Sequence, residues 1–311
     1  MKLSSHSFAI GIALAAIGSV LFSTKAIVVK LAYRYGVDPA TLIALRMILA
    51  VPFFAIALAL SSRGAAPISR ADHLRLVVVG LLGYYASSWL DFLGLQYVSA
   101  ALERLILYLN PTLVLLMSAL FLGKRIRRAE GLALLLAYSG IVLVFAQDVS
   151  FAGGGTALGA SLVFAAALCY AAYLVISGEM VRRIGPIRLV AYAMCVATAA
   201  VLAHWGATRP LTSLLQPAPV IWLSVVNAVV CTVLPVFATM LAVQRIGAGD
   251  TALAAMTGPV ATIGLAWFFL DEAVSVWQLA GTALVLAGVA VLTRAGLRAA
   301  PAPSTSKENR S

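Results

Sequence analysis

Charged residues are scarce in this sequence, and so are cysteine and histidine. Lys, Arg, Asp and Glu make up 11% of the 311 residues, against 62% hydrophobic residues, and the mean hydropathy is +1.01. Such a chain cannot stay in water as a globular domain. The three cysteines and three histidines lack the spacing of metal ligands, so we expect no metal site.

The sequence also lacks the common catalytic and nucleotide-binding motifs. It contains no P-loop, which would bind a nucleoside triphosphate, and no GxSxG elbow of a serine hydrolase. We therefore expect no catalytic residue, no cofactor and no enzymatic activity.

Long hydrophobic runs fill most of the chain. Runs of about 20 apolar residues can cross the ~30 Å hydrocarbon core of a bilayer, and they are too long and continuous for barrel strands. The sequence therefore predicts an all-α polytopic protein with ten transmembrane helices. The predicted spans are Phe8–Val29, Ala40–Leu60, Leu74–Leu95, Ala101–Leu122, Gly131–Phe145, Thr156–Ser177, Ile187–Trp205, Val220–Val243, Thr251–Leu270 and Val274–Leu292.

The net charge of +11 could suggest a nucleic-acid partner, but the placement of the charges argues otherwise. With the N-terminus in the cytoplasm, 16 of the 22 Lys and Arg fall on cytoplasmic segments and three on outer loops. Cytoplasmic loops of membrane proteins carry such an excess of basic residues. We therefore expect both termini in the cytoplasm, contacts with membrane lipids and no nucleic-acid partner.

The sequence contains a weak internal repeat. Residues 96–145 align with residues 244–293 at an offset of 148, which pairs Pro111 with Pro259. Five spans per copy, an odd number, invert the second copy, and inverted repeats are typical of secondary transporters. The expected domains are a first five-helix repeat over 1–147, an outer linker over 148–155, a second repeat over 156–300 and a disordered cytoplasmic tail over 301–311.

Five charged residues lie within the predicted spans, where each costs about 2.5–3.5 kcal/mol on insertion scales. They are Lys25, Arg46, Asp91, Glu103 and Arg104, and the span directions place all five in the outer half of the bundle. Two interpretations stay open. In the first, the residues lock helices together, or Glu103 and Arg104 simply lie in the wet outer interface. In the second, they form an outer gate. In a gate, Glu103 or Asp91 is the candidate for proton coupling, because apolar surroundings disfavour a charged carboxylate.

A second set of residues is predicted to line a substrate cavity near the membrane centre. Pro111 lacks an N–H and obstructs a carbonyl one turn back, so a kink frees backbone acceptors there, and Pro259 repeats this in the second copy. Paired helix breaks indicate a transporter's site, although packing kinks and interfacial aromatic belts are the alternative roles. The candidates are Tyr84, Tyr85, Trp89, Tyr108, Asn110, Pro111, Tyr170, Tyr173, Asn227 and Pro259.

Two stretches of the chain, Gly94–Phe145 and Ala242–Thr293, resemble the EamA family of the drug/metabolite transporter superfamily. The first reads GLQYVSAALERLILYLNPTLVLLMSALFLGKRIRRAEGLALLLAYSGIVLVF, with a proline inside the fourth span and a glycine-bearing fifth span. In the second, Leu270-Asp271-Glu272 is similar to the family's acidic turn. The chain departs from the family pattern at Phe22-Ser23, where many members have Trp and a small residue, and at Lys25 inside the first span.

This resemblance implies a ten-helix exporter in the bacterial inner membrane. We expect secondary active export of a small-molecule substrate, amino acid-like or a toxic organic compound, by alternating access. Protons are the candidate coupling ion, and the bundle would act as a monomer or homodimer. Two alternatives stay open: an uncoupled facilitator of small solutes, and a non-transporting membrane scaffold or lipid-handling protein.

Overall fold

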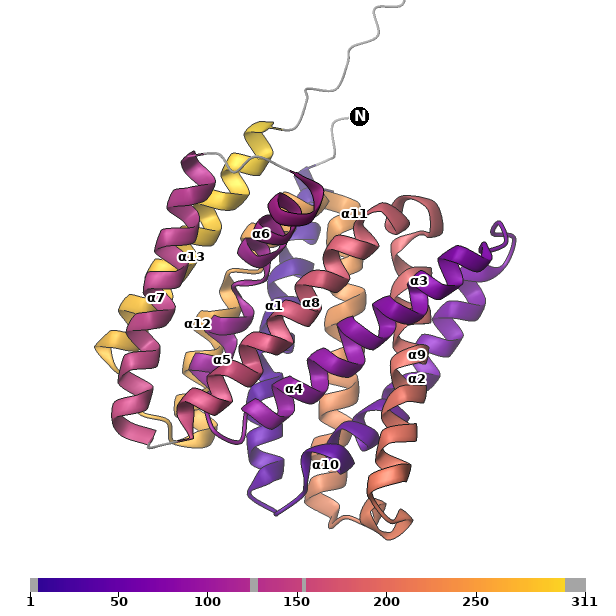
Figure 1. The fold of residues 1–311 in the computed structure, drawn as a ribbon, viewed down its shortest axis with the longest axis horizontal. Helices are drawn as coiled ribbons and strands as arrows, with labels where there is room; N and C mark the ends of the chain where they lie inside the picture. Colours follow the sequence, from indigo (N-terminus) through magenta and orange to yellow (C-terminus); the bar gives the residue numbers. More distant parts are fainter. Residues whose placement is uncertain (1–4, 124–127, 153–154, 300–311) are drawn as a thin grey trace, which may run out of the picture.

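Every regular element in the described part of the chain is a helix (Figure 1). The computed structural model describes residues 5–123, 128–152 and 155–299. The first half contains α1 (Ser5–Tyr33), α2 (Pro39–Ser62), α3 (Arg70–Gly80), the π-helical turn η1 (Leu81–Ala86), α4 (Ser87–Gly94), α5 (Ala100–Leu107), α6 (Asn110–Leu122) and α7 (Arg128–Ala152). The second contains α8 (Thr156–Ile184), α9 (Pro186–Thr208), the 3₁₀ turn η2 (Leu211–Leu214), α10 (Ala218–Ala228), the π-helical turn η3 (Val229–Val233), α11 (Leu234–Ala254), α12 (Thr257–Leu270) and α13 (Val276–Ala299).

Among the described residues, eight helical segments are long and apolar enough to cross a membrane. Two shorter apolar helices, Glu130–Ala146 and Val276–Val291, correspond to the fifth and tenth predicted spans. The prediction of an all-helical polytopic membrane protein is confirmed.

The expected linker over 148–155 begins within a helix, because α7 continues to Ala152. No glycine or proline lies between 147 and 152 to end the helix earlier. Three sets of residues that carry predictions lie outside the described part of the chain. They are residues 153–154 of this linker, the basic residues at 124, 125 and 127, and the expected tail over 301–311.

The two halves of the chain run in opposite directions through the bundle. At the end of α1, Lys30 Nζ donates to the Val98 carbonyl over 2.9 Å. The beginning of α8 lies at the same side, because Gly159 packs directly against Val98 and Gly94. Helix α8 therefore starts where α1 ends. We call this the Lys30 side of the bundle and the opposite side the N-terminal side.

The internal repeat is visible in irregular backbone features that the hydrophobic pattern does not predict. The π-helical turns η1 and η3 begin at Leu81 and Val229, which are 148 residues apart. Helices α6 and α12 both end at a residue in the left-handed conformation, Gly123 (φ 66°) and Asp271 (φ 58°), again 148 apart. Glycine adopts this conformation freely and aspartate tolerates it.

Glycines allow α7 and α13 to lie side by side at one edge of the bundle (Figure 1). A Cβ on Gly281 would stand 2.6 Å from the Gly140 carbonyl oxygen, and one on Gly288 would stand 2.7 Å from the Ala133 carbonyl oxygen. Small residues bring helix backbones close in membranes, where van der Waals packing replaces the hydrophobic effect between helices.

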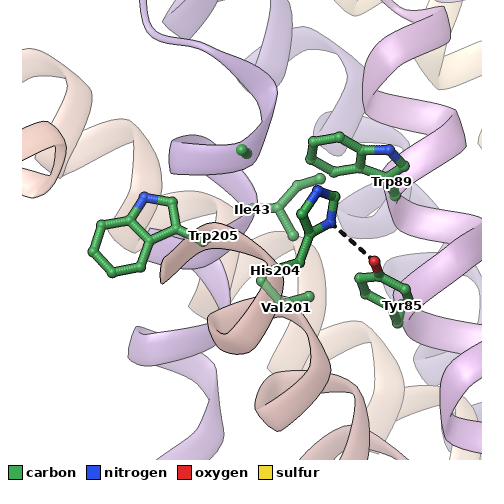
Figure 2. Close-up of a pocket in the computed structure, with 7 residues that line it drawn as sticks. Ile43, Tyr85, Trp89, Val201, His204 and Trp205 are labelled. Atoms are coloured by element: carbon green, nitrogen blue, oxygen red, sulfur yellow. Dashed lines mark hydrogen bonds between the residues drawn. The ribbon is translucent and has the colours of Figure 1, made fainter. Parts of the chain in front are cut away.

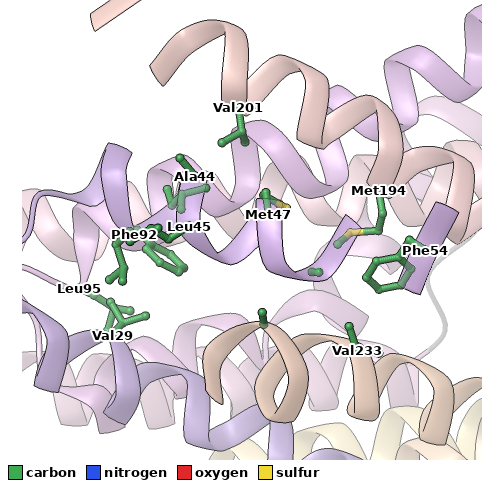
Figure 3. Packing of buried hydrophobic residues seen from close by; sticks show 14 of the residues in the cluster. Val29, Ala44, Leu45, Met47, Phe54, Phe92, Leu95, Met194, Val201 and Val233 are labelled. Atoms are coloured by element: carbon green, nitrogen blue, oxygen red, sulfur yellow. The ribbon is translucent and has the colours of Figure 1, made fainter. Parts of the chain in front are cut away.

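Helix α2 lies inside the largest cluster of buried apolar side chains (Figure 3). Met47 and Phe54 of α2 pack there with Met194 of α9 and Val233 of η3. Helices of the second repeat therefore pack against this first-repeat helix, which joins the two repeats into one body.

The N-terminus of α2 is capped by Asp38, which accepts hydrogen bonds from the backbone N–H groups of Ala40 (3.0 Å) and Thr41 (3.3 Å). Arg209, after α9, also donates to this carboxylate over 3.0 Å. Burial alone would raise the pKa of Asp38, but the hydrogen bonds from Thr41 and Arg209 outweigh it and hold the pKa below its ordinary value.

Candidate substrate-binding and gating site

A buried ion-pair cluster joins α1, α4 and α5. Lys25 Nζ lies 2.5 Å from Asp91 Oδ2 and 2.9 Å from Glu103 Oε1. The exposed fractions of Lys25, Asp91 and Glu103 are 6%, 3% and 0%. Glu103 is thus enclosed by protein, at odds with the alternative that it lies in a wet interface. One ammonium group pairs with two carboxylates, so the three residues hold α1, α4 and α5 together.

The two predicted arginines do not join this ion-pair cluster. Arg46 lies over the ring of Phe92 at 4.8 Å, and Arg104 lies over the rings of Phe22 (5.1 Å) and Tyr108 (5.0 Å). Within the described part of the chain, neither has a carboxylate within 4.0 Å. Of the five predicted charges, three therefore pair with one another, and the two guanidinium groups contact aromatic faces instead.

The fourth span breaks one turn before its proline. The break falls at Tyr108 and Leu109, between α5 and α6. Pro111 cannot donate to the carbonyl of Leu107 four residues earlier. That carbonyl instead accepts a hydrogen bond from Asn110 Nδ2 over 2.7 Å. The freed acceptor is therefore satisfied by a side chain of the same span.

The ninth span breaks in the same way, but side chains of two other spans also bond to its carbonyl. Pro259 cannot donate to the carbonyl of Ala255, at the break between α11 and α12. That carbonyl accepts from the backbone N–H of Gly258 over 3.0 Å, from Ser19 Oγ at 2.5 Å and from the Tyr108 hydroxyl. The two repeat-related breaks are therefore joined directly, through Tyr108 from one repeat and a backbone carbonyl from the other.

Glycine is required where the two breaks meet. A Cβ on Gly258 would stand 2.5 Å from Ser19 Oγ, 2.7 Å from Arg104 Nη2 and 2.8 Å from the Tyr108 hydroxyl. We call Ser19, Arg104, Tyr108, Ala255 and Gly258 the central junction. Of the predicted site residues, Arg104 and Tyr108 lie in it, and Asn110, Pro111 and Pro259 shape the breaks that form it.

The predicted aromatic candidates form two other clusters and pack against a different hydrophobic core from Tyr108. The Tyr84 hydroxyl lies 3.2 Å from the Tyr173 hydroxyl, and the Tyr170 ring lies 5.2 Å from the Tyr173 ring. The structure therefore does not bring all the cavity candidates together around a single aromatic-lined cavity.

The second aromatic cluster surrounds His204 of α9 (Figure 2). Tyr85 bonds to His204 Nδ1 at 2.9 Å, and the Trp89 ring centroid lies 4.4 Å from the imidazole. The cavity here has a volume of about 10 Å³, room for about one water molecule. His204 was not among the predicted site residues.

Asn227, the last of the predicted cavity residues, lies fully buried in α10. Neither its Oδ1 nor its Nδ2 has a hydrogen-bond partner among the described residues. It contributes to no contact of the central junction given above, so its placement in a substrate cavity stays a prediction.

A lock on the Lys30 side joins α1 to both broken spans. Lys30 Nζ lies 2.7 Å from Glu272 Oε1, just after α12, and Glu272 also accepts from the backbone N–H of Ala100, the first residue of α5. This lock was not predicted, although the sequence does carry its signal in the acidic turn after α12 and in a lysine at the end of the first span.

An apolar groove of about 620 Å³ opens beside the break in the ninth span. Met256 and Thr257, which line it, directly precede Gly258 of the central junction. Its α1 residues, Ile12 and Ala16, come before Ser19, whereas Val260 and Ala261 follow Gly258 in α12, so the groove runs past the junction and extends to its N-terminal side. The junction is therefore flanked by the lock on the Lys30 side and by an apolar groove along α1 and α12.

Two inverted repeats of apolar helices, each with a broken span meeting its partner at the centre, define a polytopic membrane transporter fold. The sequence profile of the EamA-like transporter family matches residues 9–146 and 157–294. The chain therefore belongs to the EamA-like transporter family, within the drug/metabolite transporter superfamily.

Two relatives of the chain are named as transporters. It is 33% identical over 273 residues to the uncharacterized transporter YcbK of Bacillus subtilis, covering 85% of this chain and 86% of that protein. It is 26% identical over 250 residues to the uncharacterized transporter YyaM of the same organism, covering 77% and 79%. A crystal structure at 24% identity matches with a TM-score of 0.62 over 94% of this chain and 98% of that chain, which shows the fold alone.

Proposed function

We propose that the protein is a secondary active transporter that exports a small organic metabolite, amino acid-like or a toxic organic compound, by alternating access. One observation carries this proposal: the Tyr108 hydroxyl of one repeat bonds the Ala255 carbonyl of the other, where both spans break. Hydrogen bonds between the broken helices of inverted repeats can part when the repeats rock, which exposes polar groups to a solute.

The side of the membrane follows from the basic residues, which gather on the segments expected in the cytoplasm. On this assignment both termini are cytoplasmic in a bacterial inner membrane, and the Lys30 side faces out. The lock between Lys30 and Glu272 closes the outer side. The groove beside Met256 and Thr257 then adjoins the central junction and extends, at Ile12 and Ala16, to its cytoplasmic side, where an exporter loads its substrate.

Glu103 is the proposed coupling residue. Its Oε2 has no hydrogen-bond partner among the described residues, and its Oε1 shares Lys25 with Asp91. A proton taken up by Glu103 releases Lys25 to Asp91 alone and loosens α5 from α1. Because Arg104 follows Glu103 in α5, this loosening reaches the central junction directly.

The test is a comparison of the metabolites in the medium of bacteria producing wild-type protein or Glu103→Gln at equal membrane levels. Asp72→Asn is the control, because it makes the same change in an ion pair with Arg183 away from the junction. Specific compounds should accumulate outside with wild type and Asp72→Asn but not with Glu103→Gln. Equal export by all three, independent of external pH, would favour the uncoupled facilitator. No accumulation from wild type would refute export and favour a scaffold role.

A further inference from the structure

The charges buried between α1, α2, α4 and α5 do not balance. They are three cations and two carboxylates, each at most 6% exposed, and both carboxylates are held by Lys25. The other buried carboxylate of the first repeat, Asp72, pairs with Arg183 instead. This leaves Arg46 and Arg104 without a carboxylate among the described residues. An uncompensated buried charge is costly, so a guanidinium in this state is suited to receive an anion.

Arg104 is the arginine that faces the central junction. Its Nη2 lies beside Gly258, and its one hydrogen bond among the described residues is a long contact of 3.5 Å to the Ser19 carbonyl. Its Nε is buried without a hydrogen-bond partner in the described part of the chain. Arg46 instead lies over Phe92, which belongs to the large apolar cluster.

The backbone around Arg104 also favours negative charge. Helix α12, of 14 residues, begins at Thr257, so the positive end of its dipole lies at Gly258 beside the guanidinium. The guanidinium also lies over the rings of Phe22 and Tyr108, which restrict its movement. A fixed, planar guanidinium can take both oxygens of a carboxylate at once.

We propose that Arg104 binds an anionic group, foremost a carboxylate, of the exported solute. This inference rests on the proposed export function and names its substrate class: a small organic acid or amino acid with an apolar body. The apolar groove lined by Met256 and Thr257 adjoins Gly258 and suits the apolar part of such a molecule. Binding would supply the negative charge that the cluster lacks and replace the weak contact to the Ser19 carbonyl.

The test uses the same metabolite comparison with Arg104→Gln, Arg104→Lys and, as control, Arg209→Gln, which removes an exposed arginine paired with Asp38. Compounds enriched outside wild-type cells should carry a carboxylate or another anionic group. Arg104→Gln should lower their export about tenfold or more, the loss typical of a charge-assisted hydrogen bond, and Arg104→Lys should retain part of it. Arg209→Gln should match wild type.

Two outcomes overturn the inference while leaving the proposed export intact: enriched compounds that carry no negative charge, or undiminished export by Arg104→Gln. If Arg104→Gln does not reach the membrane, uptake into inverted vesicles with wild-type protein decides instead. Each enriched acid should enter about tenfold faster than its primary amide, and equal rates would overturn the inference. A wild type that enriches nothing refutes the export function itself, and the inference with it.

Discussion

Lys25 should be the residue whose loss most weakens the bundle, because it alone compensates two buried carboxylates. Lys25→Met keeps an unbranched side chain but leaves Asp91 and Glu103 charged at 3% and 0% exposure. Removing one partner of a buried pair costs about 3–5 kcal/mol. Here two carboxylates lose their cation together, so we expect a loss of unfolding free energy at the upper end of that range.

Two companion variants separate charge compensation from packing. Glu103→Gln leaves Lys25 paired with Asp91 alone, so it should cost about 1 kcal/mol, the net value of a typical hydrogen bond. The triple variant Lys25→Met/Asp91→Asn/Glu103→Gln removes the charge altogether. Neutral groups of similar size replace buried ion pairs at little cost, so the triple variant should be more stable than Lys25→Met alone.

The assay is unfolding of the purified protein in mixed micelles with an increasing fraction of denaturing detergent, followed by tryptophan fluorescence. The expected order of midpoints is wild type, then Glu103→Gln, then the triple variant, with Lys25→Met lowest. A Lys25→Met midpoint equal to wild type would refute the reasoning, since the carboxylates would then not depend on this ammonium. A triple variant as weak as Lys25→Met would show that packing, not charge, is lost.

Three further predictions concern other parts of the fold. The pKa of Asp38 is lowered, so its charge contributes its full stabilisation of the folded state above about pH 5, and this contribution is lost as pH falls through the lowered pKa. Asp38→Asn, still a good N-cap, should therefore unfold more readily at pH 7, and a series of unfolding curves should show the difference shrink as pH falls below about 3.9. Glu272→Gln removes a partly exposed ion pair with Lys30 that is worth about 1 kcal/mol. A cysteine placed at Val98, which is 3% exposed, should then react about fivefold faster with an impermeant maleimide, and an unchanged rate would argue against a lock. Gly281→Ala places a Cβ 2.6 Å from a carbonyl oxygen of α7 and should lower the unfolding free energy by about 1–3 kcal/mol. Gly264→Ala has open space around it and should not destabilise the protein, and the midpoints of detergent unfolding measure both effects.

The features predicted from the sequence are those with a local cause. Apolar runs give the helices, because a backbone in lipid has to satisfy its own hydrogen bonds. Pro111 and Pro259 give the two breaks, because a proline frees a carbonyl one turn back wherever it lies in a helix. The depth of a residue in the membrane also follows from its position within its span. For this reason Lys25, Asp91 and Glu103 were all expected in the outer half of the bundle.

The pairing of the charges depends on the direction in which each helix faces, and the sequence does not supply this. The π-helical turn over Leu81–Ala86 adds rotation to the third span, so helical spacing does not relate residues before it to residues after it. Within this turn, Tyr84 contacts Tyr173 of α8, while Tyr85 contacts His204 of α9. The bond between Lys30 and Glu272 joins residues 242 apart in the chain, beyond any local pattern.

The backbone of the bundle is nearly symmetric between the repeats, but its chemistry is not. Positions 148 residues after Glu103 and Arg104 hold Thr251 and Ala252, so the second repeat has no counterpart to either charge. When inverted repeats exchange conformations, a symmetric backbone makes the two end states similar in packing. In the proposed cycle, the charges of the first repeat would distinguish the two states. A ligand shifts such an equilibrium only by binding one state more tightly than the other. Glu103 and Arg104, the residues proposed to take a proton and an anion, are therefore where the proposed cycle would draw its driving force.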